Sequence, residues 1–375
     1  MRTYRNVFKE IGKSDAEIDK KLEDAIREFF HGEDSFYHET DDGMGYLEDT
    51  GNHDARTEGM SYGMMMCVQM DMKEEFDRIW KWAKKYMYME DGENEGYFAW
   101  SCGTDGKKNS FGPAPDGEEF FAMSLFFASH RWGSADGIFD YDSQARAILR
   151  ACLHKGESGR PGKAMWNRDN ALVLFVPGSP FSDPSYHLPH FYELFAEWAD
   201  EDDRLFWKKA AAASRDYLVT ACHGRTGLSS EYANFDGSPV DKELPWGNFG
   251  SFFSDAYRTA ANIALDAEWF GDDRGQLDVP LRMMRFFGTE LEAVRCAYKI
   301  DGTPLDRTVL HPLGLLSTIA QGALAVPYAS EGFGIASRWV ESFWRQPLRK
   351  GERRYYDNCL YIFALLALSG RYRIW

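Results

Sequence analysis

The segment from Pro115 to Ala128 reads PDGEEFFAMSLFFA, and its pattern decides the fold. A polar start with carboxyl groups leads into a helical stretch that is apolar on nearly all sides. Such a helix contacts other helices over most of its surface, so it belongs in a core. Five further stretches, 43 to 69 residues apart, begin in a similar way: GMSYGMMM from Gly59, PSYHLPHFYELF from Pro184, FSDAYRTAANIAL from Phe253, HPLGLLSTIAQGAL from His311 and RYYDNCLYIFALLAL from Arg354.

Helices of a second, amphipathic kind are predicted between these stretches. The first begins at Ser14, and Glu17 three residues later completes a capping-box pattern. Ile18, Leu22 and Ile26 then form an apolar stripe with the period of a helix. Comparable runs are Glu74–Tyr86, Ser143–His154, Asp203–Cys222, Pro280–Leu291 and Gly332–Arg345.

Six inner and six outer helices in alternation predict an all-α fold, an (α/α)6 barrel. An open helical array is the competing geometry, because repeats of this length also build solenoids. No linker or change of composition divides the chain, so we expect one catalytic domain over residues 1–375. A closed double ring would place the starts of all six inner helices at one end, around a common cavity.

The composition limits the partners of this protein. A net charge of −16 argues against binding to nucleic acid or to an anionic membrane surface. Aromatic residues make up 15% of the chain, which favours a large core or a groove for sugars. No cysteine pair has CxxC spacing, so we expect no metal ion, and no cofactor motif is present.

Two further expectations concern location. The first residues, MRTYRNVFKEIGKSDAE, lack the apolar segment of a secretory signal. No apolar run reaches 18 residues, so no membrane-spanning helix is expected. Together with the unpaired cysteines, these features predict a cytoplasmic protein.

Three carboxyl groups lie at or near the starts of inner helices. Glu58 stands in RTEGMSYG, where it is either a functional group or an acid favoured by the helix dipole. Asp116 is either functional or the N-cap of its helix. Asp255 lies between aromatic residues and Arg258, which is an unusual setting for a surface acid. Single histidines such as His187 are interpreted as structural.

Carboxyl groups that face each other across a cavity are the minimal equipment for cleaving a glycosidic bond. One protonates the leaving oxygen and the other activates water or attacks the sugar. The rings of Trp100, Trp166 and Tyr186 are candidate platforms for sugar faces, because all three lie in loops rich in Gly, Asn and Pro. Each of these rings could instead belong to the core.

The segment RTEGMSYGM around Glu58 resembles the general-acid motif of glycoside hydrolase family 8. The segment from Pro115 resembles the family's signature, with Gly117 and Glu118 in place of the more usual Ala-Asp. Within that family, the chain is most similar to the reducing-end xylose-releasing exo-oligoxylanases. The supporting segments are GYFAWSC from Gly96, MWNRDN from Met165, SDPSYHLPHFYELF from Ser182, LHP from Leu310 and RRYYDNCLY from Arg353.

The resemblance implies an (α/α)6 barrel and an inverting reaction without a metal ion. Glu58 matches the general acid, Asp255 the general base, and Asp116 the acid that holds the sugar at the point of cleavage. Tyr186 matches a tyrosine that helps to place the water. For an inverting pair we expect the two reacting carboxyl groups to stand roughly 6.5–9.5 Å apart. Glu58 would need a raised pKa to hold its proton, and Asp116 is a candidate cause.

Further residues are expected to bind the substrate, an oligosaccharide of xylose. Arg258 follows Asp255 by one helical turn, where it can pair with that carboxylate. Tyr356 lies in the supporting segment from Arg353. Trp100 and Trp166 are the candidate stacking rings.

The Leu310–Pro312 segment predicts where the substrate is cut. In the exo-acting subgroup a matching loop blocks the groove beyond one sugar, and His311 would bind the reducing-end hydroxyl. The simpler interpretation is that His311 only caps a helix that begins with Pro312.

Three other interpretations remain open. The chain could be an endo-acting xylanase, cellulase or chitosanase of the same family. It could be a sugar-binding barrel without catalytic activity, which the contexts of Glu58 and Asp255 disfavour. It could also be a sugar epimerase, although that chemistry would centre on histidines.

Overall fold

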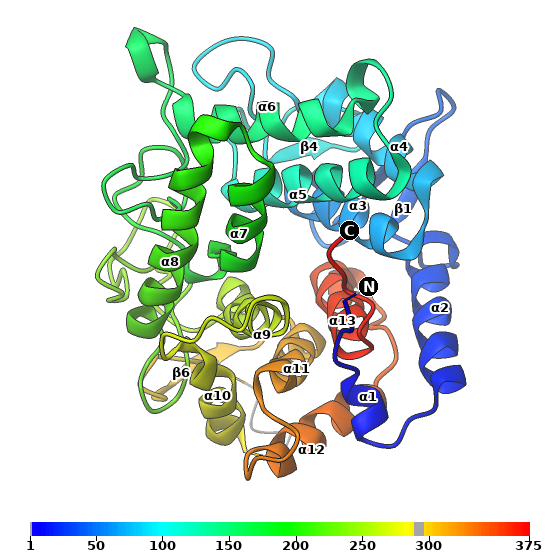
Figure 1. Ribbon diagram of the computed structural model, residues 1–375, viewed down its shortest axis with the longest axis vertical. Coiled ribbons are helices and arrows are strands. Elements are labelled where there is room, and N and C mark those ends of the chain that lie inside the picture. The colour runs from blue at the N-terminus through cyan, green and yellow to red at the C-terminus, as the bar shows by residue number, and fades with distance from the viewer. Residues whose placement is uncertain (1, 289–295) are drawn as a thin grey trace. The chain divides into compact units, whose positions relative to one another are not determined.

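Helices dominate the computed structural model, which describes residues 2–288 and 296–375 (Figure 1). Two kinds of helix alternate along the chain, as the sequence predicts. The inner helices are α3 (Thr57–Met70), α5 (Pro115–Trp132), α7 (Pro189–Trp198), α9 (Arg258–Trp269), α11 (Pro312–Gln321) and α13 (Tyr355–Leu368). The outer helices are α2 (Asp15–His31), α4 (Lys73–Trp82), α6 (Tyr141–His154), α8 (Arg204–Ala221), α10 (Val279–Phe287) and α12 (Phe333–Trp344), and the short α1 (Val7–Glu10) precedes them.

Burial separates the two kinds of helix. Every residue of α13 is buried, which fits its apolar character on all sides. In contrast, α4 buries one stripe, formed by Phe76, Ile79, Trp80 and Trp82. The capping box before α2 is also present, because the backbone N–H and hydroxyl of Ser14 donate to Glu17 Oε2 at 2.9 and 2.6 Å.

Four boundaries differ from the prediction. A short 3₁₀ turn at Pro184–Tyr186 precedes α7, which begins only at Pro189, and another at Ser254–Tyr257 precedes α9. The run expected to reach Tyr86 leaves the α-helix after Trp82 and continues as a π-helical turn. The run expected to reach Leu291 is helical to Phe287, and its residues 289–291 lie outside the described residues.

The chain forms two compact units. The first unit comprises residues 2–26, 180–190 and 210–373, and the second comprises residues 27–179, 191–209 and 374–375. Parts of α2, α7 and α8 therefore belong to each unit. Within the described residues no helix combines the length and apolar character needed to cross a membrane.

In the second unit, α3 packs against α5 and α4, and α5 packs against α6. Two small antiparallel pairs accompany them, β1 (Tyr37–Glu39) with β2 (Gly45–Leu47), and β3 (Asp54–Arg56) with β4 (Ser101–Gly103). Gly117 allows the starts of α3 and α5 to approach closely, because a Cβ atom there would lie 2.5 Å from Thr57 Cβ. The helix starts that carry Glu58 and Asp116 are thus neighbours.

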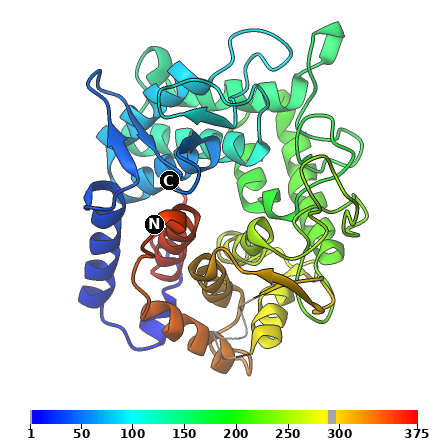
Figure 2. The same cartoon turned by 180° about the vertical axis from the view of Figure 1, so that it is seen from behind.

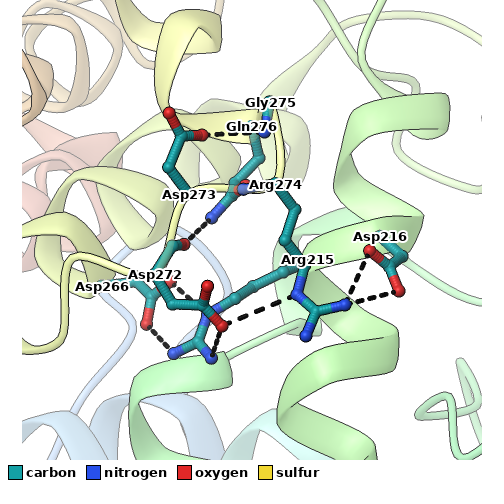
Figure 3. Close-up of polar contacts among 8 residues, drawn as sticks. All are labelled: Arg215, Asp216, Asp266, Asp272, Asp273, Arg274, Gly275 and Gln276. Carbon is teal, nitrogen blue, oxygen red and sulfur yellow. Dashed lines mark hydrogen bonds and ion pairs between the residues drawn. The ribbon is translucent and has the colours of Figure 1, made fainter.

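In the first unit, α11 packs between α9 and α13, and the three helices lie side by side in both views (Figures 1 and 2). Helices α10 and α12 cover them, and β5 (Cys296–Tyr298) pairs with β6 (Pro304–Thr308). A buried ion pair joins α8 to α9, since Arg215 donates from Nε and Nη2 to both oxygens of Asp266 at 2.8 and 2.7 Å (Figure 3).

Candidate active site

One group of candidate residues lies in the second unit. Glu58 and Asp116 occupy the second positions of α3 and α5. At these positions the positive end of the helix dipole favours a carboxylate. Ala114 is the N-cap of α5, so the interpretation of Asp116 as an N-cap is wrong. Asp116 is instead buried and accepts a hydrogen bond from the Gly117 N–H at 2.9 Å.

Trp100 presents a partly exposed ring beside this pair, with 38% of the residue exposed. Its carbonyl accepts from the Thr57 N–H at 2.9 Å, which ties it to the start of α3. The Arg56 guanidinium lies 5.3 Å from the centre of the ring, and Asp49 and Asp54 hold that guanidinium from the other side at 3.2 and 3.1 Å. The arrangement provides a fixed apolar face on which a sugar could stack.

Trp166 does not have an exposed face. Its residue is only 2% exposed, and its ring packs edge-on against Tyr192 and Trp207 with centres 5.8 and 5.0 Å apart. Our expectation of a sugar platform at Trp166 is therefore corrected. It is a core residue, because its loop folds inward onto α7 and α8.

Two buried glutamates follow Asp116, and the sequence did not indicate a role for them. Glu118 accepts from the Phe98 N–H at 3.0 Å, and Glu119 accepts from the Tyr192 hydroxyl. Burial raises the pKa of Glu118 to about 8, and the charge of Asp116 contributes. The unusual Gly117-Glu118 sequence after Asp116 was the available signal.

A separate group of candidate residues lies in the first unit, around the turn that carries Asp255. One third of the Asp255 side chain is exposed, and its Oδ1 lies 3.4 Å from Nη2 of the buried Arg258. The ion pair predicted from their spacing is therefore present. Arg258 also faces two aromatic rings, with its guanidinium carbon 5.5 Å from the centre of Tyr186 and 5.9 Å from that of Tyr356.

Two buried carboxyl groups near Asp255 were not predicted. Asp183 caps the 3₁₀ turn of Tyr186, because its Oδ1 accepts from the Ser185 N–H at 2.7 Å. Glu231 lies in a loop, where no periodic pattern marks it. Burial raises the pKa of both groups well above their usual range, and the charge of Asp255 acts in the same direction.

His311 stands at the N-cap position of α11, but its side chain does not cap that helix. Its Nδ1 lies 2.9 Å from Oδ2 of Asp357, which is fully buried. Asp357 in turn accepts from the Gly314 N–H at 2.8 Å, and Arg349 donates to both Asp357 and the Leu310 carbonyl. The His311 ring is thus oriented, and Nε2 is the nitrogen available to a ligand.

Two further questions about the titratable side chains are whether they could hold a metal ion and whether His187 is structural. Among the residues that the structure describes, no group of three or more His, Cys, Asp or Glu side chains is arranged to hold a metal ion. His187 is structural, as expected, since it is buried between the hydroxyls of Ser182 and Ser214 at 2.9 and 2.8 Å.

Carboxyl groups at the starts of inner helices are the residue type that cleavage of a glycosidic bond requires, and the comparisons with known proteins assign this chain to the glycosidases. Residues 36–367 match the profile of the glycosyl hydrolases family 8. The chain belongs to this family, and its fold class is the all-α (α/α)6 barrel that we predicted.

Individual relatives match the whole chain. A reducing end xylose-releasing exo-oligoxylanase of Halalkalibacterium halodurans is 56% identical over 380 residues, covering 100% of this chain and 95% of that protein. A protein of the same name from Bifidobacterium adolescentis is 52% identical over 371 residues, covering 98% of this chain and 96% of that protein. The solved structure of Rex8A from Paenibacillus barcinonensis complexed with xylose has a TM-score of 0.95 and 54% identity, covering 99% of this chain and 97% of Rex8A.

Proposed function

We propose that this protein is an inverting exo-oligoxylanase that releases xylose from the reducing end of short β-1,4-xylo-oligosaccharides. The observation that carries this proposal is the high identity, over the full chain, with relatives that bear that name. The oriented His311 at the start of α11 supports it, because a fixed ring nitrogen can bind a sugar hydroxyl.

In the proposed mechanism, Glu58 gives its proton to the glycosidic oxygen as the bond to the anomeric carbon breaks. Asp255 takes a proton from the water that attacks that carbon from the opposite face. Arg258 orients the Asp255 carboxylate through their ion pair. Asp116 holds the sugar at the point of cleavage, Tyr186 helps to place the water, and Trp100 and Tyr356 contact the substrate.

We propose that the reducing end is recognised by His311. A site that binds a hydroxyl group discriminates strongly against analogues that lack it, because buried polar groups then lose their partner. We expect xylotriose to give xylobiose and xylose, while its alditol is nearly inert. In His311→Ala this discrimination should weaken more than turnover does, and chromatography of the products measures both.

The alternative is an endo-acting enzyme of the same family. An open groove binds sugars on both sides of the cut, so end-labelled xylohexaose would be cleaved at several internal bonds from the first minutes. That product pattern would replace the exo assignment with the endo assignment.

We also propose one catalytic domain over residues 1–375 and a cytoplasmic location. Continuous homology over the chain supports the first proposal. Buried free thiols at Cys67, Cys102, Cys152, Cys222 and Cys359 are compatible with a reducing compartment and support the second.

A further inference from the structure

Three carboxyl groups gather around the turn that carries Asp255. Asp183 is fully buried, Glu231 is 2% exposed, and the side chain of Asp255 is one third exposed. The guanidinium group of Arg258 lowers the pKa of Asp183, and that of Arg307 lowers the pKa of Glu231. Ionising all three carboxyl groups would place three negative charges against these two positive ones, and two of the three groups have almost no contact with solvent, so a protonated Asp183 or Glu231 is favoured.

Burial decides which group is ionised. Asp255 has the most solvent and forms the ion pair with Arg258, so its charged form is the best stabilised. Asp183 has no solvent, and its Oδ2 has no hydrogen-bond partner among the described residues. An ionised Asp183 would leave charge on an oxygen without a partner, which is far more costly than burying a neutral group.

The contacts of Asp183 lead to the proposed base. Its Oδ1 accepts from the Ser185 N–H at 2.7 Å. The Ser185 hydroxyl accepts from Arg258 Nη2 at 3.0 Å, and the same nitrogen lies 3.4 Å from Asp255 Oδ1. Asn262 holds Ser185 from the other side, donating to its carbonyl at 2.8 Å. A movement of Asp183 is therefore transmitted to the carboxylate of Asp255 through two side chains.

We infer that Asp183 serves the reaction as an uncharged carboxylic acid, a positioning residue that holds Ser185 and Arg258 so that Arg258 stays paired with Asp255. This inference rests on the proposed function, in which Asp255 is the general base. A charged Asp183 would compete with Asp255 for Arg258 and would make Asp255 harder to ionise.

The surroundings of Asp183 agree with a neutral group. The pKa of Asp183 is raised well above its usual range by burial and by the charge of Asp255, while Arg258 and the hydrogen bonds from Ser185 act in the opposite direction. The other titratable groups that face it are Glu231 and Tyr232 from the neighbouring loop and Tyr217 from α8. Burial raises the pKa of Tyr217 and Tyr232 above the usual value of 10, so both are uncharged near neutral pH, and burial also raises the pKa of Glu231.

The test compares Asp183→Asn with Asp183→Ala, using xylotriose and the pH profile of kcat/KM. Asparagine keeps the acceptor for Ser185 without a charge, so we expect kcat within about threefold of the wild type and an unchanged acid limb. Alanine removes the acceptor, and kcat should fall by about tenfold or more with a smaller change in KM. Infrared difference spectra should show a protonated carboxyl band at neutral pH that Asp183→Asn lacks.

Three results would overturn the inference. If Asp183 is ionised, Asp183→Asn removes a negative neighbour and the acid limb moves to lower pH. If the charge is required, Asp183→Asn loses as much activity as Asp183→Ala. If position is irrelevant, a folded Asp183→Ala turns over like the wild type. Asp255→Asn, measured in parallel, tests the proposed function separately, because retained activity there would remove Asp255 as the base.

Discussion

Glu58 lies at the second position of α3, where a carboxyl group has a structural interpretation as well as a chemical one. Replacement of Glu58 by alanine distinguishes these two interpretations. General acid catalysis contributes about 10²–10⁴-fold, so kcat of Glu58→Ala on xylotriose should fall by about that factor. A xylosyl fluoride, whose leaving group departs without a proton, should lose far less. Equal losses on the two substrates would assign Glu58 a structural role.

Asp357 orients the ring of His311, which we propose binds the reducing end of the substrate. The carboxylate accepts from His311 Nδ1, Arg349 and the Gly314 N–H, and this fixes the tautomer of the ring. Asparagine has one acceptor oxygen and cannot serve all three donors. We therefore expect Asp357→Asn to reduce the preference for xylotriose over its alditol, as compared by initial rates on the two substrates.

Asn358 provides the matched control for that experiment. It exchanges hydrogen bonds with the backbone of Arg349 at 2.8 and 3.0 Å but does not contact His311. Asn358→Ala therefore loosens the same loop while leaving the partner of His311 in place. If both variants lose discrimination equally, loop rigidity and not the orientation of His311 explains the effect.

At the scale of elements, periodicity predicted the helices and failed at the turns that carry the site. Two kinds of apolar pattern predicted twelve helices. A helix that is buried on all sides is apolar all round, whereas a half-buried helix is apolar along one stripe only. The 3₁₀ turns at Pro184 and Ser254 follow from local contacts such as the Asp183 cap, which no periodic pattern records. Tyr186 and Asp255 were singled out by their local sequence and received their proposed roles from the resemblance, whereas Asp183 and Glu231 were missed because only folding buries them.

The buried ion pair between Arg215 of α8 and Asp266 of α9 should stabilise the contact between these two helices. Arg215 and Asp266 are both almost fully buried, so removing one partner leaves an uncompensated charge. Arg215→Ala should lower the free energy of unfolding by about 3–5 kcal/mol. Arg274, which pairs with Asp216 at the surface in Figure 3, is the control, and Arg274→Ala should cost at most about 1 kcal/mol. Urea denaturation measures both, and equal costs would contradict the difference in burial.

At the scale of the whole molecule, the sequence predicted the class of substrate better than the details of its site. The net charge of −16 argued against polyanionic partners, and the helix pattern indicated the fold class. The role of Trp166 could not be predicted, because an aromatic residue in a loop is exposed or buried according to how the loop packs. The orientation of His311 depends on Asp357 and Arg349. Both are far from His311 in the sequence and come close to it only in the folded chain.

The pH dependence of stability reports on the buried carboxyl groups. Glu118 titrates near 4.5 in the unfolded chain and at about 8 in the folded protein. Between these pH values only the folded state keeps the proton. The contribution of Glu118 to the free energy of unfolding is therefore complete below pH 4.5. It is lost as the pH rises towards 8, at a rate of at most about 1.4 kcal/mol per pH unit.

The buried histidines change the stability with pH in the opposite direction. The pKa of His187 and His190 is lowered by burial to about 3, so their contribution is present above pH 6.5 and is lost at lower pH. They contribute almost no slope between pH 6.5 and 8, and Lys84, whose pKa burial lowers to about 8, opposes the slope of the buried carboxyl groups only near the upper end of that range.

In that range we expect the free energy of unfolding of the wild type to decrease with rising pH, as measured by urea denaturation. Glu118→Gln keeps an acceptor for the Phe98 N–H but carries no proton to lose, so its decrease should be shallower. Glu331 is exposed, and Glu331→Gln should leave the slope unchanged. The remaining slope of Glu118→Gln would then belong to Asp183 and Glu231, whose pKa values burial also raises. Parallel curves for the wild type and Glu118→Gln would show that Glu118 is already ionised in the folded protein.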